Sequence, residues 1–242
     1  MTQKLRLDRL LSNLGYGPRR QIQSHIRKGK FVFSGRAISD PSEKVEVSKQ
    51  ALENATYEGE PLEHLAPMVI KVHKPAGYVC AHHDEDGLSI FHLLPERFRL
   101  RTPTLTTVGR LDKDTTGLIL CSDGGDIIHA LTHPKNHIEK EYHVTLADPL
   151  SGEEADIFAS GTLMLRSEDK PLLPATLKQI DEKTCTLILH EGRYHQVKRM
   201  FAALGNKVES LHRIRVGALS LDGLEEGAWD YVREEDLKRL LS

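Results

Sequence analysis

The chain has 242 residues, of which 28% are charged and 39% hydrophobic, and its formal net charge is −2 at pH 7. No stretch approaches the ~20 apolar residues of a membrane-spanning helix, and Cys80, Cys121 and Cys185 lie far apart with no C-x-x-C pair. We therefore expect a cytoplasmic protein with no membrane association, disulfide framework or zinc knuckle, and with room for one large domain and an appendage or for two domains.

The charge is divided unevenly along the chain. Residues 1–50 contain 11 Lys and Arg against 4 Asp and Glu, whereas the remaining 192 residues contain 22 against 31. A basic segment attracts polyanions, and such an asymmetry is typical of a chain in which one module binds nucleic acid. A solvated basic surface without a ligand is the alternative interpretation.

The N-terminal segment predicts two short helices followed by strands. Leucines at helical spacing indicate a helix over residues 7–14, and Pro18 begins a second helix that ends at Gly29. Residues 31–33, followed by a tight turn, and residues 44–47 are predicted to be partner strands. The outer surface of the second helix is basic and predicts phosphate contacts by Arg19, Arg20, Arg27 and Lys28.

An acidic, irregular stretch follows these elements. Residues 50–67 are predicted to form a short final strand and then a linker. We place the boundary at residue 62, which gives an N-terminal domain of residues 1–62 and a second domain of residues 63–242.

The second domain is organised around residues 108–122. The contiguous apolar residues 118–121 are typical of a strand buried on both faces. Gly109 and Gly117 flank a preceding loop of charged and hydroxyl side chains that includes Arg110 and Asp112. Polar groups on a rigid strand favour a functional site, although a capped turn explains the same residue types.

Further elements follow from periodicity. Alternation over residues 139–146 predicts a half-buried strand with Tyr142 facing inward, most often as a core tyrosine. The remaining predicted strands are 68–73, 162–165, 175–180, 184–189, 208–216 and 219–221, and the predicted helices are 126–131, 153–159 and 233–241.

The segment E-G-R-Y-H-Q-V-K-R-M-F-A-A-L-G at residues 191–205 predicts an amphipathic helix that ends at Gly205. Its apolar residues form a buried stripe, and His195 and Lys198 lie on an adjacent face. Judged by residue type alone, this face is interpreted as the solvent-exposed basic end of a helix.

These elements together predict an α+β fold with a mixed, largely antiparallel sheet, because no regular βαβ alternation is present. The sequence has no P-loop, no G-x-G-x-x-G after a strand and no G-x-S-x-G. His129, His133 and His137 are spaced i, i+4, i+8, but Pro134 interrupts the helix, so we expect no metal site.

Several of these motifs resemble a known family. G-R-L-D-x-x-T-x-G-L-x-L at residues 109–120, K-x-Y-x-V at 140–144 and G-R-x-H-Q-V-K-R-M at 192–200 are similar to the three motifs of the RsuA/RluA superfamily of pseudouridine synthases. L-x-x-L-L-S-N-L-G-x-G-x-R-R and I-R-K-G-K-F-x-F-S-G, within residues 5–50, resemble an S4 RNA-binding domain.

The resemblance implies an enzyme that isomerises uridine to pseudouridine in RNA without a cofactor. It implies that Asp112 is the essential carboxylate, that Tyr142 packs its ring against the target uracil and that Lys198 pairs with the carboxylate. It also implies that Arg110 contacts the flipped nucleotide's phosphate or fills the space that the base leaves.

Within the superfamily, H-E-G-R-Y-H-Q-V-K-R-M-F-A-A-L-G and the E-D-K-P-x-x-P-A loop at residues 168–175 look most like the small-subunit enzymes. The implied target is uridine 516 of 16S rRNA, within a small-subunit assembly intermediate, and the implied enzyme is a monomer. Two alternatives stay open: a 23S rRNA enzyme of the same subfamily, and a catalytically silent S4-type RNA-binding or ribosome-assembly factor. A metal-dependent nuclease is a third class, but the sequence offers no cluster of carboxylates for it.

Overall fold

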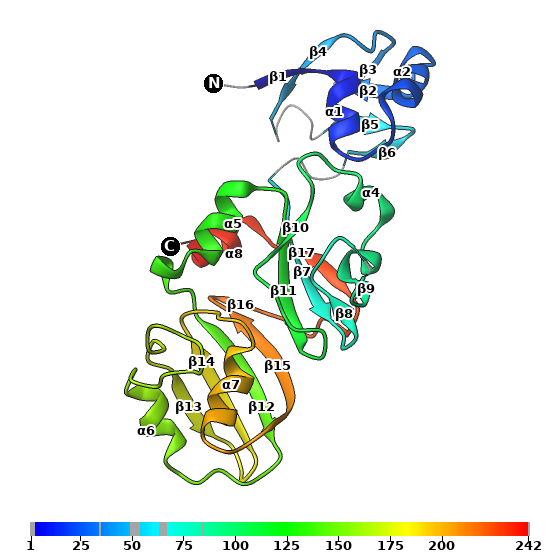
Figure 1. Ribbon diagram of the computed structural model, residues 1–242. Helices are drawn as coiled ribbons and strands as arrows, with labels where there is room; N and C mark the ends of the chain where they lie inside the picture. The colour runs from blue at the N-terminus through cyan, green and yellow to red at the C-terminus, as the bar shows by residue number, and fades with distance from the viewer. Residues whose placement is uncertain (1–2, 34, 49–53, 63–66, 84, 242) are drawn as a thin grey trace. The chain divides into compact units, whose positions relative to one another are not determined.

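A computed structural model describes residues 3–33, 35–48, 54–62, 67–83 and 85–241 (Figure 1). The chain divides into two compact units. The N-terminal unit comprises Met1–Val69, Leu94–Thr106 and Ser122–Gly125, and the C-terminal unit comprises Ile70–Leu93, Thr107–Cys121 and Asp126–Ser242. The expected boundary after residue 62 stays a prediction, because residues 63–66 lie outside the described residues.

Two short helices supply most of the core of the N-terminal unit. The expected leucine stripe is confirmed in α1 (Leu7–Asn13), and Pro18 is the N-cap residue of α2 (Arg19–Arg27). The fixed φ of proline suits this position at a helix start. The buried residues of this core are Leu7, Leu10, Leu11, Leu14, Ile22, Ile26, Phe31, Ile38, Val45, Ala55 and Tyr57.

The predicted pairing of residues 31–33 with 44–47 is wrong. The described strands of this unit are β1 (Gln3–Arg6), β2 (Phe31–Phe33), β3 (Arg36–Ile38), β4 (Lys44–Val47), β5 (Thr56–Tyr57) and β6 (Glu60–Pro61). β2 pairs with β3 and β5, whereas β4 pairs with β1. Gly35, at φ 75°, lies where the chain returns directly from β2 onto β3, which leaves β4 to pair with the N-terminal strand. The strand expected within residues 50–67 is present as β5 and β6, and residues 49–53 lie outside the described residues.

A buried carboxylate joins β1, α1 and α2. Asp8 Oδ2 accepts hydrogen bonds from Arg6 Nη2 and Arg19 Nη2, both at 3.0 Å, and from Gln23 Nε2 at 2.7 Å. Burial acts to raise the pKa of Asp8, but hydrogen bonds from Arg6, Gln23 and Arg19 outweigh it and hold the pKa well below its usual range. Asp8 is therefore charged in the folded protein at neutral pH.

A mixed sheet forms the C-terminal unit, as expected for the α+β class. Within the described residues it has nine strands in the order β13-β14-β12-β15-β11-β7-β17, with β10 beside β11 and β16 beside β15. β11 runs parallel to β15, whereas β12–β14, β12–β15, β13–β14 and β7–β17 are antiparallel. The bounds are β7 (Val69–Lys74), β10 (Thr106–Val108), β11 (Thr116–Ser122), β12 (Lys140–Leu146), β13 (Thr176–Gln179), β14 (Thr184–Leu189), β15 (Val208–Val216), β16 (Leu219–Ser220) and β17 (Trp229–Tyr231). A separate parallel pair joins β8 (Tyr78–Val79) and β9 (Leu88–Ser89).

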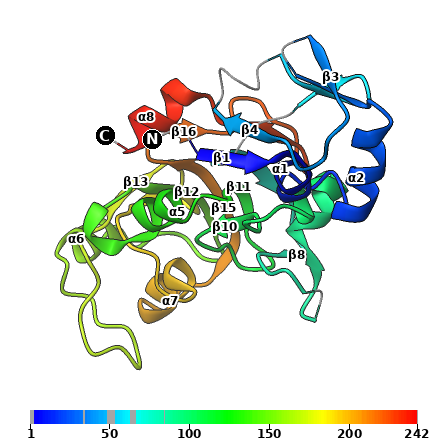
Figure 2. The same ribbon diagram turned by 90° about the horizontal axis from the view of Figure 1, so that it is seen from above.

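Helices cover the sheet in two groups. α5 (Gly125–Thr132) and α8 (Glu234–Leu241) pack with β11 and β15 through Leu118, Leu131 and Leu240. α6 (Glu154–Ala159) and α7 (Gln196–Ala203) lie on one face of the β12–β15 region, as the turned view shows (Figure 2), and the rings of Phe158 and Phe201 meet edge to face at 5.3 Å. The remaining described helices are α4 (Glu96–Arg99) and the 3-10 helices Ile90–Leu93 and Pro134–Asn136.

The predicted strand at residues 162–165 is not present. Leu172 N donates to Leu163 O at 2.9 Å, so this segment pairs with the loop that returns after it rather than with the sheet. Leu165 is buried, which explains why the apolar residues resembled a strand. β17 was missed by the sequence analysis because its three residues have no neighbouring periodic pattern.

Asp8→Asn removes the charge that three donors share, and we expect the free energy of unfolding to fall by about 1–3 kcal/mol, because hydrogen bonds to a charged group are lost while the half-exposed guanidinium groups of Arg6 and Arg19 regain water. Because the native pKa lies below that of an unfolded aspartate, near 3.9, the contribution of Asp8 is full above about pH 5 and is lost as the pH falls. Urea unfolding between pH 3 and pH 7 measures both effects. The exposed Asp40, whose side chain accepts only local bonds from Ser42, supplies the control Asp40→Asn. An Asp8→Asn curve that matches the control at pH 7 would contradict the assignment.

Candidate active site

A loop between β10 and β11 places Asp112 just before the start of β11, a strand in the middle of the sheet. The end of this loop depends on Gly117, which has φ 105° and pairs with Arg213 of β15. A Cβ atom at position 117 would lie 2.2 Å from the carbonyl oxygen of Arg213, so only glycine allows the two strands this close. The expected buried strand is confirmed, since Leu118, Ile119, Leu120 and Cys121 are almost wholly inaccessible.

A buried lysine supports the Asp112 loop, defined here as residues 109–115. Lys74, at the end of β7, is fully buried, and its Nζ donates to the carbonyl oxygens of Thr115 at 2.7 Å, Pro75 at 3.0 Å and Lys113 at 3.2 Å. Burial lowers the pKa of Lys74, and its negatively charged neighbours, which include Asp114 and Asp112, act against that shift. The lysine thereby fixes the backbone on both sides of Asp114.

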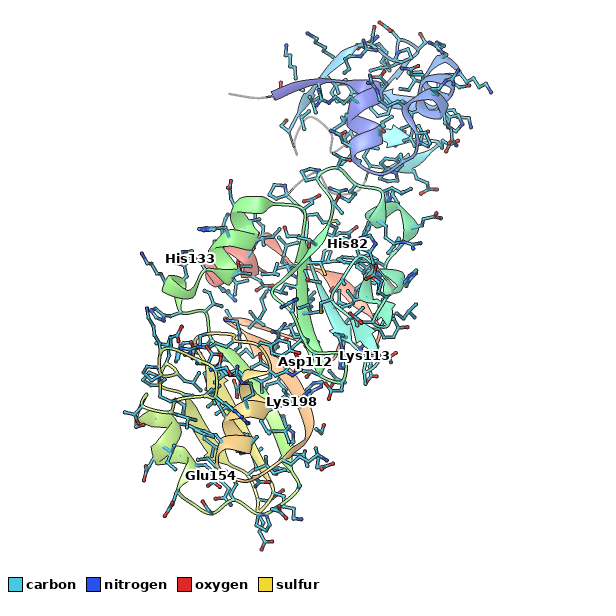
Figure 3. The ribbon with its side chains drawn as sticks, in the orientation of Figure 1. His82, Asp112, Lys113, His133, Glu154 and Lys198 are labelled. Carbon is cyan, nitrogen blue, oxygen red and sulfur yellow. The ribbon has the colours of Figure 1, made fainter. Side chains whose placement is uncertain are left out.

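Asp112 is brought together with two side chains from the distant segment around α7. Lys198 Nζ lies 3.2 Å from Asp112 Oδ2, and His195 Nε2 lies 3.4 Å from Oδ1. Figure 3 shows Asp112 and Lys198 side by side at the end of the Asp112 loop. About a quarter of the Asp112 side chain is exposed, so the carboxylate is held but still accessible.

Lys198 also binds a second carboxylate, which the sequence analysis did not single out. Its Nζ donates to Asp114 Oδ1 at 2.5 Å, a shorter contact than the one with Asp112. Partial burial acts to lower the pKa of Lys198, but Asp114 and Asp112 outweigh it and raise the pKa. The hydrogen bond from Lys198 in turn lowers the pKa of Asp114. Lys198 is therefore a permanent cation between two carboxylates.

The residues before α7 form a loop rather than the start of the helix. His195 is the N-cap residue and has a left-handed backbone, with φ 48°. This conformation costs free energy in a residue with a side chain, so the surrounding contacts must hold it. Arg193 and Arg199 supply such contacts, because both bind Glu168 of the loop before β13, at 3.1 Å and 2.7 Å.

A cavity of about 540 Å³ adjoins Asp112, within the range of small-ligand sites. Tyr142 lines it and is buried, and the guanidinium of Arg213 lies 6.0 Å from the centre of the Tyr142 ring. Lys140 also lines the cavity, and burial lowers its pKa to about 8. Arg110 lines the cavity and is exposed. The cavity thus combines the Asp112 carboxylate and the buried Tyr142 ring with the cations of Lys140, Arg110 and Arg213, and Asp86 and Glu191 also line it.

The predicted RNA-binding residues lie on α2 in the N-terminal unit, apart from Lys28, which is its C-cap residue. Arg20, Arg27 and Lys28 are exposed, whereas Arg19 uses part of its guanidinium to bind Asp8. The histidine-rich segments do not form a recognisable metal site: among the described residues, no group of three or more His, Cys, Asp or Glu is arranged to hold a metal ion. No helix in the described part of the chain is long and apolar enough to span a membrane.

Sequence reasoning missed Lys74, Asp114 and the contact of His195 with Asp112. The turn Lys74-Pro75-Ala76-Gly77 was the available signal for Lys74, but nothing in it shows that the ammonium turns inward. The role of Arg213 was also missed. Its Nε donates to Leu118 O at 2.7 Å, but nothing in the sequence distinguishes it from Arg215 in the same predicted strand.

Comparison with known proteins defines the class to which this fold and cavity belong. The family profile of RNA pseudouridylate synthases matches residues 68–203, and that of the S4 domain matches residues 5–50. The chain belongs to the RNA pseudouridylate synthase family and is an enzyme of that class with an N-terminal S4 domain. The silent-factor alternative is therefore set aside.

Individual relatives are similar over nearly the whole chain. The ribosomal small subunit pseudouridine synthase A of Vibrio vulnificus is 39% identical over 236 residues, which cover 96% of this chain and 98% of the relative. The protein of the same name from Haemophilus influenzae is 38% identical and covers 98% and 100%. A crystal structure of a pseudouridylate synthase is 37% identical, with a TM-score of 0.67 and coverage of 98% and 99%.

Lys74→Met removes a donor from three carbonyl oxygens, of which Lys113 O keeps its bond from Gly77 N, so we expect the free energy of unfolding to fall by about 1–3 kcal/mol. Because the Asp112 loop loses its support, kcat for pseudouridine formation should fall about 100-fold with little change in RNA affinity. The control is Lys71→Met on the same strand, whose ammonium instead binds Asp222 at 2.7 Å. Equal kcat values for the two variants would show that the Lys74 contacts do not position the loop.

Proposed function

We propose that this enzyme converts uridine to pseudouridine in 16S rRNA, at uridine 516, with Asp112 as the reacting carboxylate. The observation that chiefly supports the proposal is the accessible Asp112 carboxylate, held 3.2 Å from Lys198 beside a cavity that Tyr142 lines. Relatives named ribosomal small subunit pseudouridine synthase A, similar over nearly the whole chain, support the choice of RNA.

The reaction detaches uracil from its ribose, turns the base and rejoins it through carbon, so it is an isomerisation that consumes no group donor. Asp112 either attacks C1′ of the sugar, attacks C6 of the base or removes a sugar proton. In each case the carboxylate must be ionised and must keep a lone pair free. Lys198 stabilises its charge and His195 contacts its other oxygen, while a quarter of its side chain stays open to substrate.

A uridine within folded RNA reaches Asp112 only when it leaves the base stack, which costs a few kcal/mol. The cavity offsets this cost. Tyr142 presents a buried ring for the uracil, and Arg110 stands exposed at the cavity, where it meets the phosphate of the flipped nucleotide or fills the vacated space. Lys140 and Arg213 add positive charge around the same space.

The S4 domain adds affinity at a second place on the RNA. Its exposed Arg20, Arg27 and Lys28 contact phosphates without reading sequence, while the hydrogen bond to Asp8 limits Arg19 to a partial role. We further propose that the enzyme acts as a cytoplasmic monomer on an assembly intermediate of the small subunit, since a buried rRNA uridine is most accessible before assembly is complete.

Asp112→Asn should retain RNA affinity within about threefold and reduce turnover to background, because the amide cannot act as a nucleophile or base. Lys198→Met should lower kcat by about 10–150-fold, the value of one charge-assisted hydrogen bond. Carbodiimide mapping of 16S and 23S rRNA by primer extension detects the product. Asp156→Asn, an exposed carboxylate on α6, is the control. Turnover by Asp112→Asn would contradict the assignment of the carboxylate, and modification of 23S rRNA alone would contradict the target.

Replacing Arg20, Arg27 and Lys28 with alanine should weaken RNA binding and flatten its dependence on salt, by about 0.7 in the slope of log affinity against log salt for each lost contact. The control makes the same change at Lys238 and Arg239 on α8 and at Arg233 just before it. Filter binding between 50 and 300 mM salt measures both. If the control variant loses as much slope as the Arg20, Arg27 and Lys28 variant, the proposed phosphate contacts by these three residues are contradicted.

A further inference from the structure

Tyr194 is exposed to an unusual degree for an aromatic side chain beside a cavity. Its relative exposure is 69%, the highest among the exposed large hydrophobic side chains of the described residues, and it lines the same cavity as Asp112. Because most of this side chain stays open to solvent at the wall of a cavity, its outer surface is available to a ligand.

The ring of Tyr194 is held in place. It stacks on the imidazole of His195 with ring centres 3.9 Å apart and planes inclined by 16°. Its backbone oxygen accepts a hydrogen bond from Arg199 Nη1 at 3.2 Å, and Arg199 is itself bound to Glu168. The left-handed backbone of His195 is part of the same arrangement. One face of the Tyr194 ring is therefore covered by His195 in a fixed stack.

This stack leads from the carboxylate to solvent. The edge of His195 contacts Asp112, with Nε2 at 3.4 Å from Oδ1, and Tyr194 continues outward from His195. A uridine that enters the cavity stays covalently joined to its neighbours in the RNA strand. At least one neighbouring nucleotide must therefore lie near the rim of the cavity, where the exposed ring stands.

We propose that Tyr194, supported by His195, is a stacking platform for the nucleobase next to the target uridine. Every base has a face that stacks on an aromatic ring, so the platform accepts any base and holds the strand rather than reading it. Stacking on one ring typically changes affinity by about 5–150-fold. The inference rests on the proposed function, because it requires an RNA uridine in the cavity.

The test compares kcat and KM for pseudouridine formation on a 16S rRNA transcript. Tyr194→Ala and Tyr194→Leu should each raise KM about tenfold with kcat within twofold, and Tyr194→Phe and Tyr194→Trp should match the wild type. Leucine keeps apolar area but no aromatic face, so it separates stacking from general burial. The loss should be constant between 50 and 300 mM salt, unlike the loss from the α2 variant, because stacking releases no counterions. Ile180→Ala, another exposed apolar residue, is the control.

A second measurement reports the contact directly. RNA with 2-aminopurine next to the target uridine, on the 5′ side in one probe and the 3′ side in another, is titrated with full-length protein. We expect the wild type and Tyr194→Phe to quench the 2-aminopurine fluorescence of one of the two probes. Tyr194→Leu should not quench it. Unchanged KM in Tyr194→Leu, or a fall in kcat alone, would overturn the platform. An inactive wild type would instead contradict the proposed function, and thermal unfolding verifies that each variant is folded.

Discussion

The contact between Asp112 and Lys198 unites parts of the C-terminal unit that are far apart in sequence. The carboxylate belongs to the loop between β10 and β11, and the ammonium belongs to α7. They meet only because β11 pairs with β15 at a place where Gly117 has no side chain to separate the strands. The meeting of these two charged side chains therefore depends on a close approach between the backbones of Gly117 and Arg213.

Two lysines hold the Asp112 loop by different means. Lys198 contacts the carboxylates of Asp112 and Asp114 at a partly exposed position, where it neutralises charge. Lys74 is wholly buried and contacts carbonyl oxygens, so it orders the backbone at the cost of removing an ammonium from water. This division leaves Asp112 free of any direct contact with Lys74, so that its lone pairs face Lys198, His195 and the cavity.

Local sequence patterns predicted individual helices and strands, but they did not predict contacts between distant segments. The leucine spacing predicted α1, the alternation around Tyr142 predicted β12 with Tyr142 inward, and the apolar run predicted the buried part of β11. The predicted partner of β4 was wrong: β4 pairs with β1. Strand pairing depends on contacts between segments distant in sequence, which local patterns do not show. The prediction that Lys198 pairs with Asp112 rested only on the family resemblance. No pattern in the sequence indicated that the Lys74 side chain is buried or that His195 has a left-handed backbone.

The uneven charge of the chain places the general attraction for RNA and the candidate active site in different parts of the sequence. The basic first 50 residues supply long-range attraction, whereas the remaining residues have an excess of acidic groups and would repel RNA if their charge were evenly spread. Within the C-terminal unit, Arg110, Lys140 and Arg213 line the cavity, and Lys198 contacts Asp112 beside it. These cations offset the acidic excess locally, so under the proposed function the cavity is where an RNA would approach this unit most favourably.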